Sequence, residues 1–335
     1  VLDAVGRREF FRIEVGLAPQ GLAVSADGTR LFVQNFMGRS LSVIDLQPLV
    51  GLGEFRAPVL ATVATSATES LTATVLQGKR LFYDARDPRL TRDSYMSCAS
   101  CHNDGGHDGR TWDMTGLGEG LRNTASLRGR AGAQGPLHWT GNFDEVQDFE
   151  GQIRALAGGT GLMSDAAFAT GTRSQPLGDR KAGLSADLDA LAAYVGSLAV
   201  SDASPFRDAA GALTADGTAG STVFRTLNCA SCHTGTPFTG SGTVGLRNIG
   251  TIKPSSGTRL GAALTGIDVP TLRDVWATAP YLHDGSAATL DAAVRAHSGV
   301  TVSDADLSVL TAYLRQIGRE ETTAPGSPAS VTTTY

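Results

Sequence analysis

The chain has 335 residues, which is enough for about two domains, and 41% of them are hydrophobic against 18% charged. No apolar run approaches the ~18 residues that a membrane-spanning helix needs, and a net charge of −5 argues against a nucleic-acid-binding surface. We therefore expect a globular protein with no transmembrane segment and no nucleic-acid partner.

Residues 1–50 differ in pattern from the rest of the chain. Short β-strands are predicted at four places: 10–15, 21–24, 30–34 and 41–45. The dipeptide Asp27-Gly28 predicts a hairpin turn. The stretch 17–33 resembles one blade of a YVTN-type β-propeller, and a propeller needs about four to eight blades. We expect either a β-propeller-blade-like segment whose further blades lie upstream, or a small sheet packed on the following domain.

All four cysteines lie in two copies of Cys-Ala-Ser-Cys-His, at 98–102 and 229–233. This C-x-x-C-H pattern is the attachment signature of c-type haem, in which the two thiols bond to the haem and the histidine binds the iron. The sequence thus predicts two covalently bound c-type haems, held by these residues: Cys98, Cys101 and His102 for the first, and Cys229, Cys232 and His233 for the second.

Other uses of paired cysteines fit less well. A thioredoxin-type pair needs no following histidine, and the two halves of a zinc site are normally about 12–20 residues apart. Covalent haem attachment takes place outside the bacterial cytoplasm. We therefore expect a periplasmic or extracellular, cell-surface location, with any signal peptide either cleaved or outside this sequence.

The second half of the chain repeats the first. Each half ends in a stretch, 187–198 and 306–317, whose apolar residues fall on one face of a helix. The expected fold is mainly α, with two tandem cytochrome-c-like haem domains at 70–200 and 205–318, long irregular loops and a small N-terminal β segment. Residues 320–335 are rich in Thr, Ser and Pro, which predicts a disordered linker.

Several motifs around the haem signatures resemble the bacterial di-haem cytochrome c peroxidase/MauG family. They are Gly-Lys-Arg-Leu-Phe-Tyr-Asp at 78–84, Val-Pro-Thr-Leu-Arg at 269–273 and Thr-Ala-Pro-Tyr-Leu-His-Asp-Gly at 278–285. The resemblance covers roughly residues 70–318. It implies a first haem that reacts with H2O2 or a similar small oxidant, and a six-coordinate second haem that transfers electrons. The electrons would come from a small redox protein or a protein substrate.

The resemblance also implies the distal ligand of the second haem. The family places it at the end of a Thr-Leu-x-x-x-Val helix, where this chain has His297. We expect bis-His ligation by His233 and His297, which gives a lower potential than His/Met ligation. The alternative is a surface histidine favoured by the C-terminal end of the helix dipole.

No histidine stands near Met114, where peroxidases of the family hold a removable distal ligand of the first haem. His107 follows His102 too closely to reach the opposite haem face easily. His138 pairs with His283 in the duplicated pattern, which favours a structural hydrogen-bonding role. We therefore expect an open or water-bound distal side at the first haem.

Cleavage of peroxide also needs a nearby acid–base group. The family uses a Gln and a Glu that follow its Trp-x-Gly segment. Gln152 fills the first position, but Leu162 stands at the second. Glu150 or Glu145 could substitute, or both could be solvated surface carboxylates. The missing glutamate argues against efficient peroxidase activity.

Two further positions follow from the resemblance. Trp139 matches a tryptophan that lies between the two haems and helps electrons to hop, although it could equally fill the core. Asn123, with the carbonyl groups of Thr278 and Pro280, matches a calcium site between the domains. Oxygen ligands of this kind suit Ca²⁺.

Two classes of function compete on this sequence. One is a di-haem peroxidase or MauG-like oxidoreductase. The other is a non-catalytic electron-transfer or redox-sensing di-haem module of a larger surface protein, which bis-His ligation and the missing glutamate would suit. A third reading is that the propeller-like segment binds a partner and the cytochrome part serves it.

Overall fold

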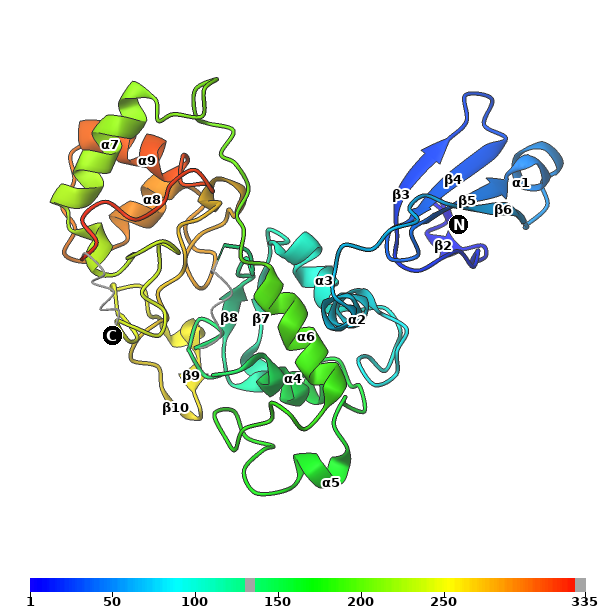
Figure 1. The fold of residues 1–335 in the computed structure, drawn as a ribbon, viewed down its shortest axis with the longest axis horizontal. Helices are drawn as coiled ribbons and strands as arrows, with labels where there is room; N and C mark the ends of the chain where they lie inside the picture. Colours follow the sequence, from blue (N-terminus) through cyan, green and yellow to red (C-terminus); the bar gives the residue numbers. More distant parts are fainter. Residues whose placement is uncertain (130–135, 329–335) are drawn as a thin grey trace. The chain divides into compact units, whose positions relative to one another are not determined.

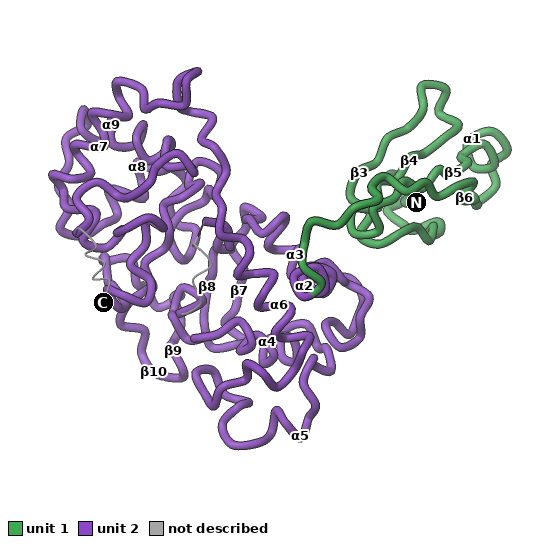
Figure 2. Tube along the Cα trace, viewed as in Figure 1, with its two compact units in different colours: residues 1–73 green, residues 74–335 purple. Residues whose placement is uncertain are grey.

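The computed structural model describes residues 1–129 and 136–328, and the chain divides into two compact units, Val1–Ala73 and Thr74–Tyr335 (Figure 2). Helices account for 28% of the chain and strands for 14%. The expectation of a mainly α fold is therefore wrong. Long glycine-containing loops, many of them turning through left-handed backbone at glycine, take up much of the second unit.

The first unit is built on a four-stranded antiparallel sheet in the order β3-β4-β5-β6 (Figure 1). Its strands are β3 (Pro19–Val24), β4 (Arg30–Asn35), β5 (Ser40–Asp45) and β6 (Val59–Ala64). A separate hairpin of β1 (Leu2–Asp3) and β2 (Arg8–Glu9) precedes the sheet, and helix α1 (Gln47–Leu52) precedes β6. The strands predicted at 21–24, 30–34 and 41–45 are confirmed. The strand predicted at 10–15 is wrong, and β6 was not predicted.

The predicted turn at Asp27-Gly28 is confirmed. Gly28 has a φ of 72°, and the side chain of Asp27 accepts hydrogen bonds from Ser25 Oγ at 2.6 Å and the Thr29 amide at 3.1 Å. Below the sheet, Val33 and Ile44 form the centre of a small buried core. A four-stranded antiparallel sheet is the repeating unit of β-propellers. Membership of a propeller stays a prediction.

The second unit contains two separate hydrophobic cores within one compact body. The first core lies between helices α2 (Ala73–Tyr83) and α6 (Ala186–Ser197), and the second between α7 (Ala215–Thr226) and α9 (Asp304–Leu314). The helices predicted at 187–198 and 306–317 are confirmed as α6 and α9. The other elements are α3 (Cys98–Cys101), β7 (Thr111–Asp113), β8 (Leu121–Asn123), α4 (Phe149–Ala155), α5 (Asp165–Phe168), β9 (Thr258–Arg259), β10 (Ala262–Ala263) and α8 (Leu290–Arg295).

The two helix pairs cross in the same way. Gly78 of α2 lies against the carbonyl group of Ala190, and Gly220 of α7 lies against that of Val309, so closely that neither glycine has room for a Cβ. A tyrosine one turn further on then packs edge-on against a phenylalanine. These pairs are Phe82 with Tyr194 at 5.1 Å and Phe224 with Tyr313 at 5.7 Å between ring centroids. The duplication seen in the sequence is therefore a duplication of structure.

The chain after α9 turns back onto the second core. Ala324 is 1% exposed, Ser327 Oγ accepts a hydrogen bond of 2.9 Å from the Gly235 amide, and Glu321 pairs with Arg207 at 2.7 Å. The prediction of a disordered linker from residue 320 is wrong for residues 320–328, because the buried alanine and the paired carboxylate fix this stretch. Residues 329–335 lie outside the described part of the chain.

Across the described ranges, 1–129 and 136–328, no helix combines the length and the apolar character that crossing a lipid bilayer would require.

Candidate haem-binding sites

The second C-x-x-C-H motif starts in a single 3₁₀ turn, Cys229–Ser231. His233 follows, and its Nδ1 lies 3.1 Å from the carbonyl oxygen of Pro270. His297 lies just beyond the C-terminus of α8, and its Nδ1 is 2.8 Å from the carbonyl oxygen of Ala293. A hydrogen bond from Nδ1–H to a backbone carbonyl is the usual way in which a metal-binding histidine is oriented. It leaves Nε2 of both rings as the ligand atom.

The ring centroids of His233 and His297 are 6.5 Å apart, and the ring planes are tilted by 55°. Two imidazoles that bind opposite faces of one metal ion through bonds of about 2 Å have centroids roughly 6 Å apart. Burial lowers the pKa of His233 to about 4, and the charge of His297 contributes to this shift. The neutral imidazole is the form that binds a metal. These residues fit a haem iron held between them.

The first motif forms the short helix α3, with Ser97 as its N-cap residue. His102 follows; its Nδ1 is buried and makes no hydrogen bond of ordinary geometry within the described chain. Burial is the main cause that lowers the pKa of His102, and it raises the pKa of Cys98 to about 11. Cys98 packs against the first core and is not in a disulfide. A partly buried histidine beside two free thiols fits the attachment of a haem here.

The ring of His138 packs against two aromatic side chains in the first half of the second unit. Its centroid is 4.3 Å from that of Phe143 and 5.1 Å from that of Phe149. Its Nδ1 lies 2.7 Å from Asn142 Oδ1 and 3.1 Å from Glu119 Oε1. No hydrogen bond to its Nε2 is found among the described residues.

The structure corrects the register of the repeat around His138. Leu137 bridges to Phe143, and Tyr281 bridges to Ala287 in the same way. The next residue adopts left-handed backbone in both loops, with φ of 63° at His138 and 69° at Leu282. His138 therefore corresponds to Leu282, and it is Trp139 that corresponds to His283. The predicted pairing of His138 with His283 is wrong by one residue.

Glu150 is fully buried in α4, so the alternative of a solvated surface carboxylate is wrong for this residue. One carboxylate oxygen accepts hydrogen bonds from Arg154 Nε at 2.8 Å and the Met163 amide at 3.1 Å. The other oxygen accepts from the Leu162 amide at 2.9 Å. Glu145 is partly buried, and its carboxylate accepts from the Lys181 amide at 2.5 Å.

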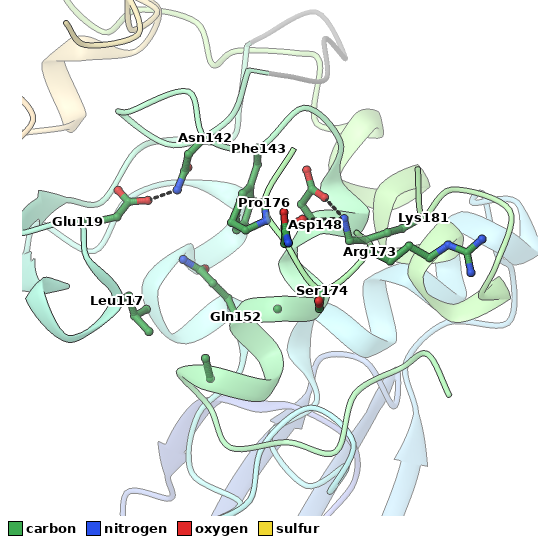
Figure 3. Close-up of a pocket in the computed structure, with 13 residues that line it drawn as sticks. Leu117, Glu119, Asn142, Phe143, Asp148, Gln152, Arg173, Ser174, Pro176 and Lys181 are labelled. Carbon is green, nitrogen blue, oxygen red and sulfur yellow. Dashed lines mark hydrogen bonds and ion pairs between the residues drawn. The ribbon is translucent and has the colours of Figure 1, made fainter. Parts of the chain in front are cut away.

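Gln152 lines a cavity of about 190 Å³ on α4. Asn142 and Glu119 also line this cavity, and the amide of Asn142 donates a hydrogen bond of 2.6 Å to Glu119 (Figure 3). The buried ion pair of Lys181 and Asp148 forms another side. His102 does not line the cavity. Gln152 therefore shares this space with the two residues that hold His138.

Trp139 connects the two halves of the second unit. Its indole Nε1 donates a hydrogen bond of 2.7 Å to the carbonyl oxygen of Asn123, and its own carbonyl accepts one of 2.7 Å from the Asp268 amide. Trp139 therefore links the part of the chain that follows the first haem motif to the part that follows the second.

Two of the predicted calcium ligands, the side chain of Asn123 and the carbonyl group of Pro280, bind each other directly. The side-chain amide nitrogen of Asn123 donates directly to the Pro280 carbonyl oxygen at 2.6 Å, and Thr278 Oγ1 donates to the Val275 carbonyl oxygen at 3.4 Å. In the described ranges no cluster of three His, Cys, Asp or Glu residues could hold a metal ion. These contacts do not fit Ca²⁺, which stays a prediction from the sequence.

Comparison with known proteins finds a family match for the region that carries the first motif. Residues 72–211 match the family model described as di-haem cytochrome c peroxidase. The match covers less than half of the chain and includes the first C-x-x-C-H motif. A second model, described as RoxA-like, cytochrome c-like, matches residues 266–299.

Individual relatives match a larger part of the chain than the family model does. Hydrazine synthase subunit gamma of Kuenenia stuttgartiensis is 29% identical over 272 residues, which are 70% of this chain and 72% of the relative. Cytochrome c peroxidase Ccp of Escherichia coli is 32% identical over 273 residues, 69% of this chain but 56% of the relative. Methylamine utilization protein MauG of Methylorubrum extorquens is 29% identical over 253 residues, 65% and 66% of the two chains.

A solved structure of hydrazine synthase from Kuenenia stuttgartiensis, pressurised with 20 bar xenon, superposes with a TM-score of 0.50. The sequence identity is 24%, and the match covers 78% of this chain and 99% of that chain. This likeness shows a shared fold.

A match to a family model described as di-haem agrees with the expectation of two c-type haems. Two residues at the first site escape prediction from the sequence, namely Glu119 and Asn142. No motif marks them, because they reach His138 through the fold.

Proposed function

We propose that this protein is a di-haem c-type oxidoreductase of the peroxidase/MauG type. H2O2 or a similar small oxidant reacts at an open first haem, and electrons pass through a bis-His second haem. One difference between the two sites carries this proposal. His297 stands 6.5 Å from His233, ring centroid to ring centroid, whereas among the described residues no second imidazole makes such a ring contact with His102.

The residues at the second site hold the haem and set its properties. The bound haem supplies one-electron redox chemistry. His233 and His297 would hold this haem through Nε2, and the carbonyl groups of Pro270 and Ala293 fix the orientation of the two rings. Two imidazole ligands give a lower potential than a His/Met pair, so the electron donor is a carrier of low potential.

Trp139 and Gln152 have supporting roles in this proposal. Trp139 is hydrogen-bonded to both halves of the second unit and lies on the electron path between them. Gln152 offers an amide to a small polar oxidant in its cavity. Glu150 is left out of the reaction, because three hydrogen bonds already occupy its carboxylate.

The partners and the location follow from the same chemistry. The electrons come from a small redox protein or from residues of a protein substrate. Because c-type haem is attached outside the bacterial cytoplasm, the protein works in the periplasm or at the cell surface.

Electron paramagnetic resonance of the purified ferric protein, before and after one equivalent of H2O2, tests the proposal. We expect one high-spin and one low-spin signal, and a change of the high-spin signal on adding peroxide. Two low-spin signals with no response to peroxide would overturn it. That result would favour the non-catalytic electron-transfer or sensing module.

A further inference from the structure

The first haem site lacks the family's glutamate at position 162, so its acid–base group must come from elsewhere. We propose that His138 is the proton-transfer residue on the free side of the first haem. This inference rests on the proposed function and adds to it the residue that handles the proton.

The position of His138 supports this role. Only 18% of its side chain is exposed, and its ring packs against Phe143 and Phe149, next to the core that also receives Cys98. Phe143, Phe149 and Cys98 all belong to or pack against the first core, so His138 lies beside the core that carries the first haem motif. The rings of His138 and His102 make no contact of the kind that joins His233 and His297. A histidine that is near the site but not in ring contact leaves space for a small molecule.

The partners of His138 determine which ring nitrogen carries the proton of the neutral imidazole. Glu119 pairs with the guanidinium of Arg122 at 3.0 Å, which favours its ionised form. An ionised carboxylate can only accept a hydrogen bond, so the proton of the His138 ring is placed on Nδ1, between Glu119 and Asn142. The unprotonated Nε2 is then the proton acceptor.

The internal repeat provides a natural comparison. Leu282 occupies the equivalent position in the second half, with almost the same backbone, φ 69° against 63°. The backbone conformation therefore does not require histidine. At the second site, where His297 opposes His233, an apolar residue suffices. At the first site the equivalent position carries a base held by a buried carboxylate.

The proposed step moves one proton. Nε2 of His138 would take the proton from one oxygen of H2O2 and return it to the other oxygen. The O–O bond breaks, and the second oxygen leaves as water. Two further protons and two electrons, delivered from a reduced one-electron carrier protein through the two haems, convert the first oxygen into a second water. In sum, H2O2, two protons and two electrons give two waters.

The test compares His138→Leu with the unchanged protein, both loaded with haem. Leucine is the matched replacement because Leu282 adopts the same conformation in the repeat. The first readout is the rate at which HCN, which must lose a proton to bind, converts the high-spin ferric signal. The second is the rate of the same spectral change with H2O2. We expect both rates to fall by about 100-fold or more, as for loss of a general base.

Further variants separate chemistry from folding. His138→Gln keeps a polar side chain. It replaces His138→Leu as the test variant if His138→Leu does not take up haem. Glu119→Gln removes the carboxylate that orients the ring and should give a smaller loss of both rates. Glu54→Gln, on the exposed side chain that pairs with Arg56, is the control and should leave both rates unchanged.

Each outcome decides one claim. If the unchanged protein has a high-spin haem that reacts with peroxide, and His138→Leu reacts equally fast, the inference is wrong and the proposed function stands. If the unchanged protein has no high-spin haem but His138→Leu gains one, His138 is an iron ligand and the proton-transfer role is overturned. If neither protein responds to peroxide, the proposed function itself fails.

Discussion

The amide of Met163 donates a hydrogen bond of 3.1 Å to the buried carboxylate of Glu150. This contact ties the loop that carries Leu162 and Met163 to helix α4. Met163 is 4% exposed and belongs to the first core. Glu150 therefore acts as an anchor for this loop.

We expect Glu150→Gln to destabilise the fold by about 3 kcal/mol, because it removes one partner of a buried, hydrogen-bonded ion pair. Asp165→Asn is the matched control. Asp165 pairs with the same Arg154 at 2.6 Å, but its side chain is 90% exposed, so its loss should cost less than about 1 kcal/mol. Chemical denaturation of the haem-loaded proteins measures both effects. Equal losses in the two variants would contradict the anchoring role.

The close crossing of α7 and α9 makes Gly220 irreplaceable. A Cβ at Gly220 would overlap the Val309 carbonyl, so Gly220→Ala should destabilise the protein by about 1–3 kcal/mol. A Cβ at Gly196 in α6 would meet no other atom within 4 Å, so Gly196→Ala should stabilise by about 0.5–1 kcal/mol. Thermal unfolding followed by circular dichroism should therefore show shifts of opposite sign. A stabilising Gly220→Ala would contradict the crossing geometry.

Replacement of His297 tests the ligation of the second haem. We expect His297→Ala to convert the low-spin signal of that haem to high spin, because no other histidine ring contacts His233 in the described part of the chain. His107→Gln should leave the low-spin signal unchanged, because His107 contacts Asn123 instead. Electron paramagnetic resonance reads both variants. A low-spin signal that survives in His297→Ala means that another residue binds the iron.

Buried Asp274 makes stability depend on pH. Burial raises its pKa to about 6, and one of its carboxylate oxygens has no hydrogen-bond partner among the described residues. The folded state therefore holds a proton that the unfolded state releases. This contribution to stability is present below pH 4 and is lost as the pH rises through 6.

Asp274→Asn should accordingly stabilise the protein at pH 7, by at most about 3 kcal/mol, and have little effect at pH 4. Asparagine also tolerates the left-handed backbone found there, φ 59°. Unfolding midpoints at the two pH values measure this. The same gain at both pH values would show that the charge of Asp274 is not the cause.

The parts of the structure that sequence could predict are those encoded by local patterns. The apolar stripe of α6 is a short-range signal, and it predicts the helix correctly. Strand β6 escaped because all of its residues are exposed and no alternation of buried and exposed positions marks it. Its pairing with β5 across an intervening helix creates the strand.

The first haem site shows the same limit. The register of the repeat around His138 is settled by the backbone bridges and left-handed φ values, and it agrees with the flanking pairs Pro136/Pro280 and Gly141/Gly285. Glu119 lies 19 residues before His138 in the chain, and only the fold brings the two side chains together. A long-range hydrogen bond of this kind leaves no periodic trace in the sequence.

The return of the chain over the second core has a practical consequence for where this protein can be trimmed. Ala324 fills part of that core, and Ser327 closes the loop after the second haem motif. A recombinant version cut after residue 318 would expose apolar surface next to the second C-x-x-C-H motif and promote aggregation. A version cut after residue 328 would keep that surface covered.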